Sequence, residues 1–284
     1  MLIRFSDTQK GPFKLGLQRG DAVHDFSARF ASVRAFLEAH PDGWDEASVD
    51  LADAPVLSAA SVRIGPPVDD AAHVYLVGAN YKKHAIEAGL DVPATPVIFM
   101  KPTTALVGPR QPIRLPSISQ QMDYEGELAV VIGRTASKVS KDDAHRYIAA
   151  VTILNDLTAR DLQWVMLGKN RIVDWLSSKA LDDSTPVGPG LVPVRAVGDI
   201  HRLKLKTWLN QDLMQDGETS MMVYSAFELL EYLSARVTLR PGDVISTGTP
   251  VGVGGFRNIF LKPGDVLKVE IQGIGRIENP VVQG

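Results

Sequence analysis

Residues 123–133 of this chain read DYEGELAVVIG. The alternation predicts a β-strand over 125–132, and because successive side chains of a strand point to opposite faces, Glu125 and Glu127 share one face and Leu128 lies on the other. Two carboxylates held side by side repel one another unless one is protonated or a cation lies between them. Taken alone, the segment favours the simpler interpretation, a polar face on a half-exposed strand.

A third carboxylate follows a second predicted strand. Residues 151–154 are an apolar run that ends at Asn155 and Asp156. As a single residue, Asp156 is more typical of a helix N-cap. Three carboxylates in a chain without cysteine, however, suit Mg²⁺, Mn²⁺ or Ca²⁺ better than zinc. Glu125, Glu127 and Asp156 are therefore the candidate metal ligands.

A histidine–glutamate pair is the second candidate for chemistry. His84 and Glu87 are three residues apart in a predicted helix, so their side chains are neighbours on one face. A carboxylate beside an imidazole fixes its tautomer and raises its basicity, as a water-activating base requires. Such pairs are also common on helix surfaces without any role, and the segment itself favours neither interpretation. Two further segments are weaker candidates. Lys179, as a lone lysine, is more typical of a solvated charge. The glycine-rich residues 246–255 could line a carboxylate site.

Composition excludes several classes of function. The chain has 284 residues, and its 30 Lys and Arg against 33 Asp and Glu give a formal charge of −3, which provides no basic surface for nucleic acid. The absence of cysteine excludes disulfides, thiolate nucleophiles and cysteine-ligated zinc. No Walker loop, zinc-protease helix or serine-esterase elbow is present. No signal peptide and no apolar run of membrane-spanning length are recognised, so a cytoplasmic location without membrane contact is expected.

The chain divides into a small unit and a large one. Strand patterns over 2–5 and 13–17 predict a small β-rich domain at residues 1–66, and residues 67–284 then form the catalytic domain. A helix is expected over 142–150. Many short strands between turn signals, with few long helices, predict an α+β fold that is mainly β.

Taken in order, these segments resemble the fumarylacetoacetate hydrolase family over about residues 70–284. Each motif alone could arise by chance, whereas all of them in family order make a specific match. Residues 180–182 read Ala-Leu-Asp where many relatives carry Ser-Phe-Asp, which leaves the shape of the pocket open there. The motifs are Gly78-Ala79-Asn80-Tyr81 with His84 and Glu87, Phe99-Met100-Lys101-Pro102, Asp123-Tyr124-Glu125-Gly126-Glu127-Leu128, the run from Asn155 to Gln163, Lys179, Pro186-Val187-Gly188-Pro189 and Thr247-Gly248-Thr249-Pro250.

The resemblance implies a fold, a cofactor and roles for residues. The fold would be a β-roll of curled sheets with a small N-terminal domain, commonly as a homodimer. The metal at the three carboxylates would be Mg²⁺ or Mn²⁺, with Ca²⁺ as a substitute in crystals. His84 and Glu87 would form a water-activating dyad on a segment that orders when substrate binds, and Lys179 would assist catalysis. The expected substrate contacts are Arg160, Gln163 and Thr249.

The resemblance also implies a reaction class on a small 2-oxo acid. The leading expectation is hydrolysis of a C–C bond in an acylpyruvate or related 2,4-dioxo acid, through activated water and a metal-stabilised enolate. Decarboxylation, isomerisation or tautomerisation, and hydration at the same metal site are alternatives, because they depend on pocket shape and water placement rather than on the ligands. A catalytically silent metal-binding protein is the remote alternative.

Overall fold

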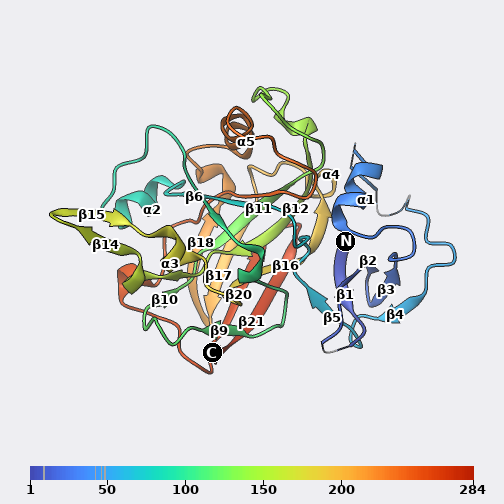
Figure 1. Ribbon diagram of the computed structural model, residues 1–284, viewed down its shortest axis with the longest axis horizontal. Coiled ribbons are helices and arrows are strands. Elements are labelled where there is room, and N and C mark those ends of the chain that lie inside the picture. The colour runs from blue at the N-terminus through green and yellow to red at the C-terminus, as the bar shows by residue number, and fades with distance from the viewer. Residues whose placement is uncertain (9, 42, 46, 48) are drawn as a thin grey trace.

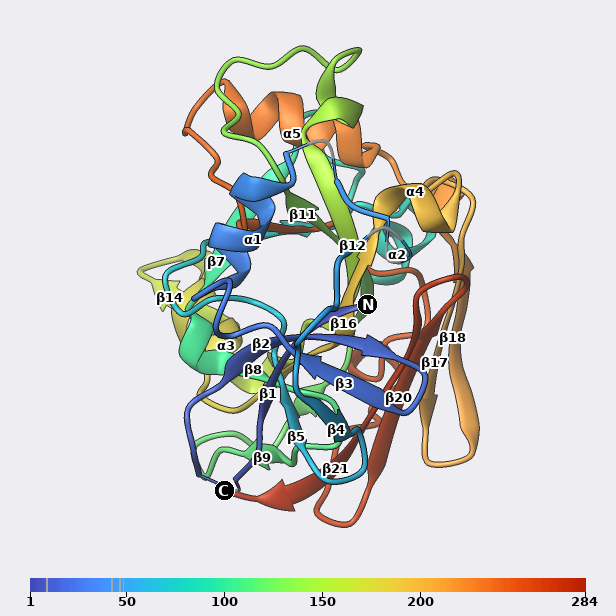
Figure 2. The same ribbon diagram turned by 90° about the vertical axis from the view of Figure 1, so that its right-hand side faces the viewer.

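The fold is mainly β, as the sequence predicts, and consists of open, curled sheets with few helices (Figure 1). The computed structural model describes residues 1–8, 10–41, 43–45, 47 and 49–284. Seen from the right-hand side of Figure 1, the N-terminal strands between residues 2 and 65 lie at the front of the molecule (Figure 2). No helix in these ranges is long and apolar enough to cross a membrane.

The largest sheet has twelve strands and runs through the centre of the molecule. Its order is β4-β3-β2-β1-β16-β12-β11-β19-β6-β7, while β5 pairs with β1 and β8 pairs with β16. The strands are β1 (Leu2–Ser6), β2 (Lys14–Arg19), β3 (Ala22–Asp25), β4 (Val56–Ser58), β5 (Arg63–Gly65), β6 (Val74–Gly78), β7 (Val97–Lys101), β8 (Leu106–Val107), β11 (Gly126–Ile132), β12 (Ile148–Asn155), β16 (Thr185–Pro193) and β19 (Val244–Ser246).

A five-stranded sheet and two short strand pairs complete the β-structure. The five-stranded order is β18-β17-β20-β21-β9, and β10–β13 and β14–β15 pair separately. These strands are β9 (Ile113–Leu115), β10 (Met122–Asp123), β13 (Thr158–Ala159), β14 (Trp164–Leu167), β15 (Asn170–Val173), β17 (Lys204–Leu209), β18 (Asp212–Glu218), β20 (Val266–Ile271) and β21 (Gly275–Gln283). The α-helices are α1 (Val33–Ala39), α2 (Lys82–Glu87), α3 (Trp175–Lys179), α4 (Val194–Val197) and α5 (Ala226–Ser234).

Strand β11 lies in the middle of the large sheet and is buried on both faces. Leu128 and Val130 pack in a core with helix α5 on one face. Ala129 and Val131 pack on the other face, in a core that includes Phe36 of helix α1. The interpretation of residues 125–132 as a half-exposed strand is therefore wrong, and its acidic face points into the protein.

The N-terminal strands continue the large sheet. Leu2 of β1 pairs with Leu191 of β16 in antiparallel register. Helix α1 begins after Ser32, whose side chain accepts a hydrogen bond from the Ala35 amide, and it packs against the face of the same sheet. The boundary at residue 66 between a small and a large domain stays a prediction.

The prediction of a helix over residues 142–150 is wrong. Only Ala144–Arg146 form a short 3₁₀ turn, and strand β12 begins at Ile148. Ala150 lies between Val131 of β11 and Pro193 of β16. Pairing on both sides thus overrides the local helical preference of the alanines.

Candidate metal centre and catalytic site

Strand register brings the three candidate ligands together. Glu127 pairs with Leu154 in the β11–β12 ladder, so the chain just before β11 lies opposite the chain just after β12. The Asp156 amide donates a hydrogen bond of 2.8 Å to the Glu125 carbonyl oxygen and fixes that junction. One oxygen from each carboxylate lies within 4.8 Å of the others. The side chains of Glu125, Glu127 and Asp156 are buried, with exposed fractions of 6%, 2% and 1%.

Two buried lysines contact these carboxylates. The Lys179 Nζ atom lies 2.8 Å from Glu125 Oε2 and 2.6 Å from Asp156 Oδ2. Lys101 Nζ lies 2.8 Å from Asp156 Oδ1 and donates hydrogen bonds to the Leu157 carbonyl and to Thr185 Oγ1. Lys179 is 3% exposed, so the interpretation of this lysine as a solvated charge is wrong.

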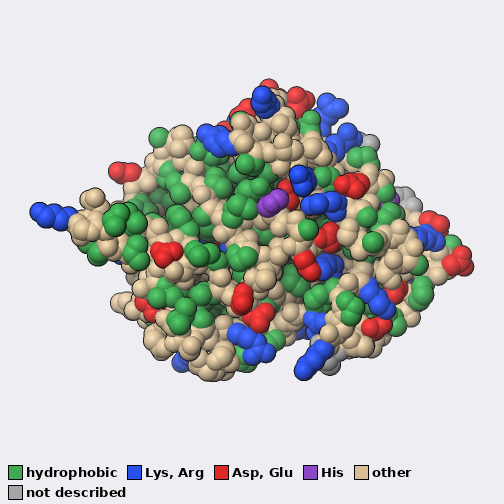
Figure 3. Space-filling view, viewed as in Figure 1, with side chains coloured by type: hydrophobic (Ala, Val, Ile, Leu, Met, Phe, Trp, Pro, Cys, Tyr) green, Lys and Arg blue, Asp and Glu red, His purple; other side chains and the backbone are tan. Residues whose placement is uncertain are grey.

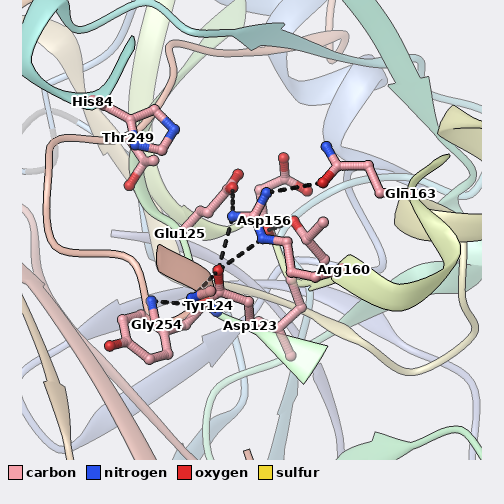
Figure 4. Close-up of polar contacts among 12 residues, drawn as sticks. His84, Asp123, Tyr124, Glu125, Asp156, Arg160, Gln163, Thr249 and Gly254 are labelled. Carbon is pink, nitrogen blue, oxygen red and sulfur yellow. Dashed lines mark hydrogen bonds and ion pairs between the residues drawn. The ribbon is translucent and has the colours of Figure 1, made fainter. Parts of the chain in front are cut away.

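Arg160 joins the metal centre to a fourth carboxylate beneath it (Figure 4). Its guanidinium lies 2.5 Å from Glu125 Oε1 and 2.8 Å from Asp123 Oδ2. Asp123 also accepts hydrogen bonds from the amides of Gly254 and Gly255. The glycine-rich loop that the sequence offered as a carboxylate site therefore binds a carboxylate of the protein itself. Arg160 orients Glu125 while it also lines the cavity described below.

Burial and charge act in opposite directions on the carboxylates. Burial raises the pKa of Glu127 well above its ordinary value, and the neighbouring Asp156 and Glu125 raise it further. Burial would also raise the pKa of Glu125, but the positive charges of Lys179 and Arg160 outweigh burial and lower this pKa. Burial lowers the pKa of Lys101, against the attraction of Asp156. Four carboxyl groups face three cations in this buried cluster, so ionisation of all four would leave one negative charge without a partner.

The cluster fits a hard divalent cation. Asp156 Oδ1 accepts no hydrogen bond in the described part of the chain, although Lys101 is close. Glu127 Oε2 is fixed by Ser246 Oγ at 2.6 Å and by the Gly248 amide at 3.0 Å. Three buried carboxyl groups offer the oxygen ligands that Mg²⁺ and Mn²⁺ prefer. The structure thus contains a buried carboxylate triad that could bind a metal, whereas the identity of the metal stays open.

The histidine–glutamate pair forms as predicted. His84 Nδ1 lies 3.4 Å from Glu87 Oε2 on helix α2, and His84 is only 8% exposed. The Gly252 amide donates to both Glu87 oxygens, at 3.1 and 3.3 Å. Burial favours a raised pKa of Glu87, but the hydrogen bonds from His84 and Gly252 outweigh it and lower the pKa. An ionised Glu87 therefore orients Nδ1 and leaves Nε2 of His84 for other partners.

A cavity of about 460 Å³ connects the dyad with the metal centre. His84 lines one side of it and Gln163 the opposite side, with Glu125 between them (Figure 4). Thr249 also lines the cavity, while its hydroxyl donates to the Gly126 carbonyl. All the residues predicted from the sequence to contact substrate or to catalyse lie at this cavity or next to it, but their roles stay predictions.

Sequence reasoning missed three supporting residues of this site. Asp123 and Lys101 occur in the quoted motifs but received no role, because a lysine at the end of an apolar strand is ordinarily exposed. Gln215 of β18 is fully buried, accepts a hydrogen bond from the Gly126 amide and donates one to Thr249 Oγ1. Nothing in the sequence around Gln215 predicts that contact, because it depends on how the second sheet packs on β11.

The mainly β fold and the buried carboxylate triad, which could bind a metal, are the two features to compare with known proteins. Residues 73–282 match the family model described as fumarylacetoacetate (FAA) hydrolase C-terminal, and the chain belongs to this family. It is 38% identical over 290 residues to a mitochondrial oxaloacetate tautomerase of Xenopus laevis, which covers 99% of this chain and 90% of the relative.

Two solved structures extend the comparison. A 5-carboxymethyl-2-hydroxymuconate delta-isomerase from Mycobacterium smegmatis is 33% identical, with a TM-score of 0.77, over 100% of this chain and 99% of the other. A maleylpyruvate hydrolase from Sphingobium sp. SYK-6, in complex with manganese(II) ion and pyruvate, is 29% identical with a TM-score of 0.79 and the same coverage. The relatives are thus enzymes that catalyse tautomerisation, isomerisation and hydrolysis.

Proposed function

We propose that this chain is a metal-dependent hydrolase that cleaves a C–C bond in an acylpyruvate or a related 2,4-dioxo acid. The observation that carries the proposal is that a base dyad, with its histidine buried and its glutamate partly buried, and a buried carboxylate triad lie at one cavity. The dyad is fixed from two sides, by its own helix and by the Gly252 amide. Most of the remaining lining is apolar, including Val77, Phe99 and Trp175, which suits the acyl part of such a substrate.

His84 and Glu87 supply the acid–base chemistry in this proposal. His84 Nε2 removes a proton from water while Glu87 holds Nδ1, and the resulting hydroxide adds to the carbonyl remote from the carboxylate. The C–C bond then breaks, its electron pair leaves with the pyruvate fragment as an enolate, and the proton on His84 is available to protonate that carbon. Lys179 places a positive charge beside the same carboxylates. Mg²⁺ or Mn²⁺ held by Glu125, Glu127 and Asp156 would supply Lewis-acid stabilisation of negative charge.

Tautomerisation of oxaloacetate is the second candidate. The specific support is the 38% identity to an oxaloacetate tautomerase over nearly the whole chain. The reaction needs no water. His84 would remove a proton from the carbon next to the 2-oxo group, and a proton would be returned to the 2-oxo oxygen to give the enol. Isomerisation of an unsaturated 2-oxo dioate would use the same base in the same way, whereas decarboxylation would release carbon dioxide.

One assay separates these reactions. Purified protein with Mn²⁺ or Mg²⁺ is offered acetylpyruvate, fumarylpyruvate and oxaloacetate, and both the enol absorbance and the products are followed. Two acid products that disappear with EDTA support the hydrolase. Exchange between the keto and enol forms of oxaloacetate without new products supports the tautomerase, and carbon dioxide supports a decarboxylase. No turnover of any substrate would contradict the proposal and favour a non-catalytic metal-binding protein.

A cytoplasmic location and a homodimer belong to the same proposal. Size-exclusion chromatography with light scattering tests the dimer, because one 30.8 kDa chain is clearly separated in mass from two. Fractionation of the producing cells tests the location.

A further inference from the structure

The β14–β15 hairpin forms one wall of the cavity and projects from the body of the molecule (Figure 1). Trp164 pairs with Val173 and Met166 pairs with Arg171 in its ladder. Residues directly opposite one another, and residues two apart in a strand, share a face of a hairpin. These four side chains therefore share one face. Trp164, Arg171 and Val173 line the cavity, so this is the face turned toward the active site.

Arg171 differs from the other cations of the cavity. Arg160 is paired with Asp123 and Glu125, and Lys179 is paired with Glu125 and Asp156. Across the part of the chain that the structure describes, no carboxylate lies within ion-pair distance of Arg171. The guanidinium lies 4.1 Å from the centre of the Trp164 ring. Stacking on the indole leaves its N–H groups directed outward in the ring plane, available to an anion.

The surroundings of Arg171 favour a substrate anion over a random surface charge. Hydrophobic side chains cover much of the face between the hairpin and the centre of the molecule (Figure 3). On the face of the hairpin that carries Arg171, the neighbouring side chains are the apolar Trp164, Met166 and Val173. A cation bordering an apolar cavity meets less competition from water than one on an open polar surface, so its pairing with a carboxylate is stronger.

The base of the hairpin connects this cation to the metal centre. The Asp174 amide donates a hydrogen bond of 2.9 Å to the Gln163 carbonyl and closes the hairpin. Trp175 follows directly and stacks on Phe99 with ring centroids 4.4 Å apart, and helix α3 then delivers Lys179 to the carboxylates. The hairpin that carries Arg171 is thereby fixed at its base by the Asp174–Gln163 hydrogen bond and by the stacking of Trp175 on Phe99.

We propose that Arg171, held by Trp164, binds the second carboxylate of the substrate and so selects 2-oxo dicarboxylic acids over 2-oxo monocarboxylic acids. This inference rests on the proposed function, since it takes the 2-oxo carboxylate end of the substrate to lie at the metal centre. A bidentate pair between guanidinium and carboxylate then fixes the opposite end. Fumarylpyruvate carries such a second carboxylate, whereas acetylpyruvate does not.

Binding of two acids of equal length tests this selectivity. Isothermal titration of the Mn²⁺-supplemented full chain compares 2-oxoglutarate with 2-oxovalerate, which differ only in a distal carboxylate or methyl group. Arg171→Gln should weaken 2-oxoglutarate binding about ten-fold and leave 2-oxovalerate unchanged, a loss of the size expected for one charge-assisted contact. Lys169→Gln is the matched control: it removes a positive charge from the same hairpin at a residue that does not line the cavity, and it should behave as wild type.

Turnover adds a second measurement that separates the two proposals. Arg171→Gln should lower kcat/KM for fumarylpyruvate about ten-fold and leave kcat/KM for acetylpyruvate unchanged. Equal effects on diacid and monoacid, or no effect on either, would overturn the role of Arg171 while the hydrolase stands. Wild-type protein that turns over none of these substrates, yet prefers 2-oxoglutarate in an Arg171-dependent way, would overturn the hydrolase while the selectivity stands.

Discussion

Replacing Lys101 by methionine tests whether the buried cluster is built for a cation. Lys101 is 2% exposed, lies 2.8 Å from Asp156 Oδ1 and donates two further hydrogen bonds. Methionine has a similar length but no charge, so Asp156 would keep only Lys179 as a counter-charge. Removing one partner of a buried ion pair costs about 3–5 kcal/mol, because the remaining charge is desolvated without compensation. In a chain of this size the melting temperature should fall by roughly 6–10 °C.

The metal should recover part of this loss. A divalent cation at Glu125, Glu127 and Asp156 replaces the missing counter-charge, so the difference in unfolding free energy between Lys101→Met and wild type should shrink in saturating Mn²⁺. Urea unfolding in EDTA and in Mn²⁺ measures both differences. Lys206→Met is the control, because its partner Asp216 lies 3.8 Å away at the surface, and such pairs contribute at most about 1 kcal/mol.

Two results would refute this reasoning. A loss below about 1 kcal/mol in EDTA would mean that Asp156 does not depend on Lys101 for its charge. An equal loss with and without Mn²⁺ would mean that the cation does not bind at Asp156.

Three further predictions concern catalysis, metal and pH. His84→Ala should lower kcat about 10²–10⁴-fold and leave Mn²⁺ affinity nearly intact, whereas the exposed His145→Ala should change neither; loss of Mn²⁺ binding in His84→Ala would contradict the dyad. EDTA should abolish turnover and Mn²⁺ should restore it, and activity that persists in EDTA would exclude a metal-dependent reaction. Burial tends to raise the pKa of Glu228, but the hydrogen bonds from Lys141 and from the Ser225 cap outweigh it and lower this pKa to about 2. The ionised carboxylate therefore stabilises helix α5 at pH values above its ordinary pKa of 4.5, and this stabilisation is lost as the pH falls toward 2. Glu228→Gln should therefore cost about 1 kcal/mol of unfolding free energy at pH 7 and nothing near pH 2, and a cost that is independent of pH would contradict the assignment.

The sequence was sufficient to predict which side chains lie together where local spacing decides it. Glu125 and Glu127 share a strand face by alternation, and His84 and Glu87 meet by helical periodicity. The apolar run that ends at Asp156 made this residue the third candidate ligand, and many short strands between turn signals predicted the mainly β fold. The hydrophobic runs of residues 126–132 and 148–155 are long enough to indicate strands buried on both faces, a signal that a clean in–out alternation cannot explain.

The sequence was insufficient where the burial of a charged residue and its partners depend on residues that are distant in the chain. Lys179 is a lone lysine in the sequence and a buried bridge between two carboxylates in the fold. Gly254 and Gly255 look like an anion loop and bind Asp123 instead. Local propensity also misled over residues 142–150, where two neighbouring strands supply the hydrogen bonds that the alanines would otherwise satisfy in a helix.

The hydrogen bond between the Asp174 amide and the Gln163 carbonyl closes the β14–β15 hairpin at its base. The three carboxylates and Lys179 all lie outside residues 164–173, so the hairpin contributes to the wall of the cavity without supplying a candidate metal ligand. Exchanging residues 164–173 should therefore change the cavity wall and leave the carboxylate cluster in place, which makes the hairpin a separate element for engineering substrate preference.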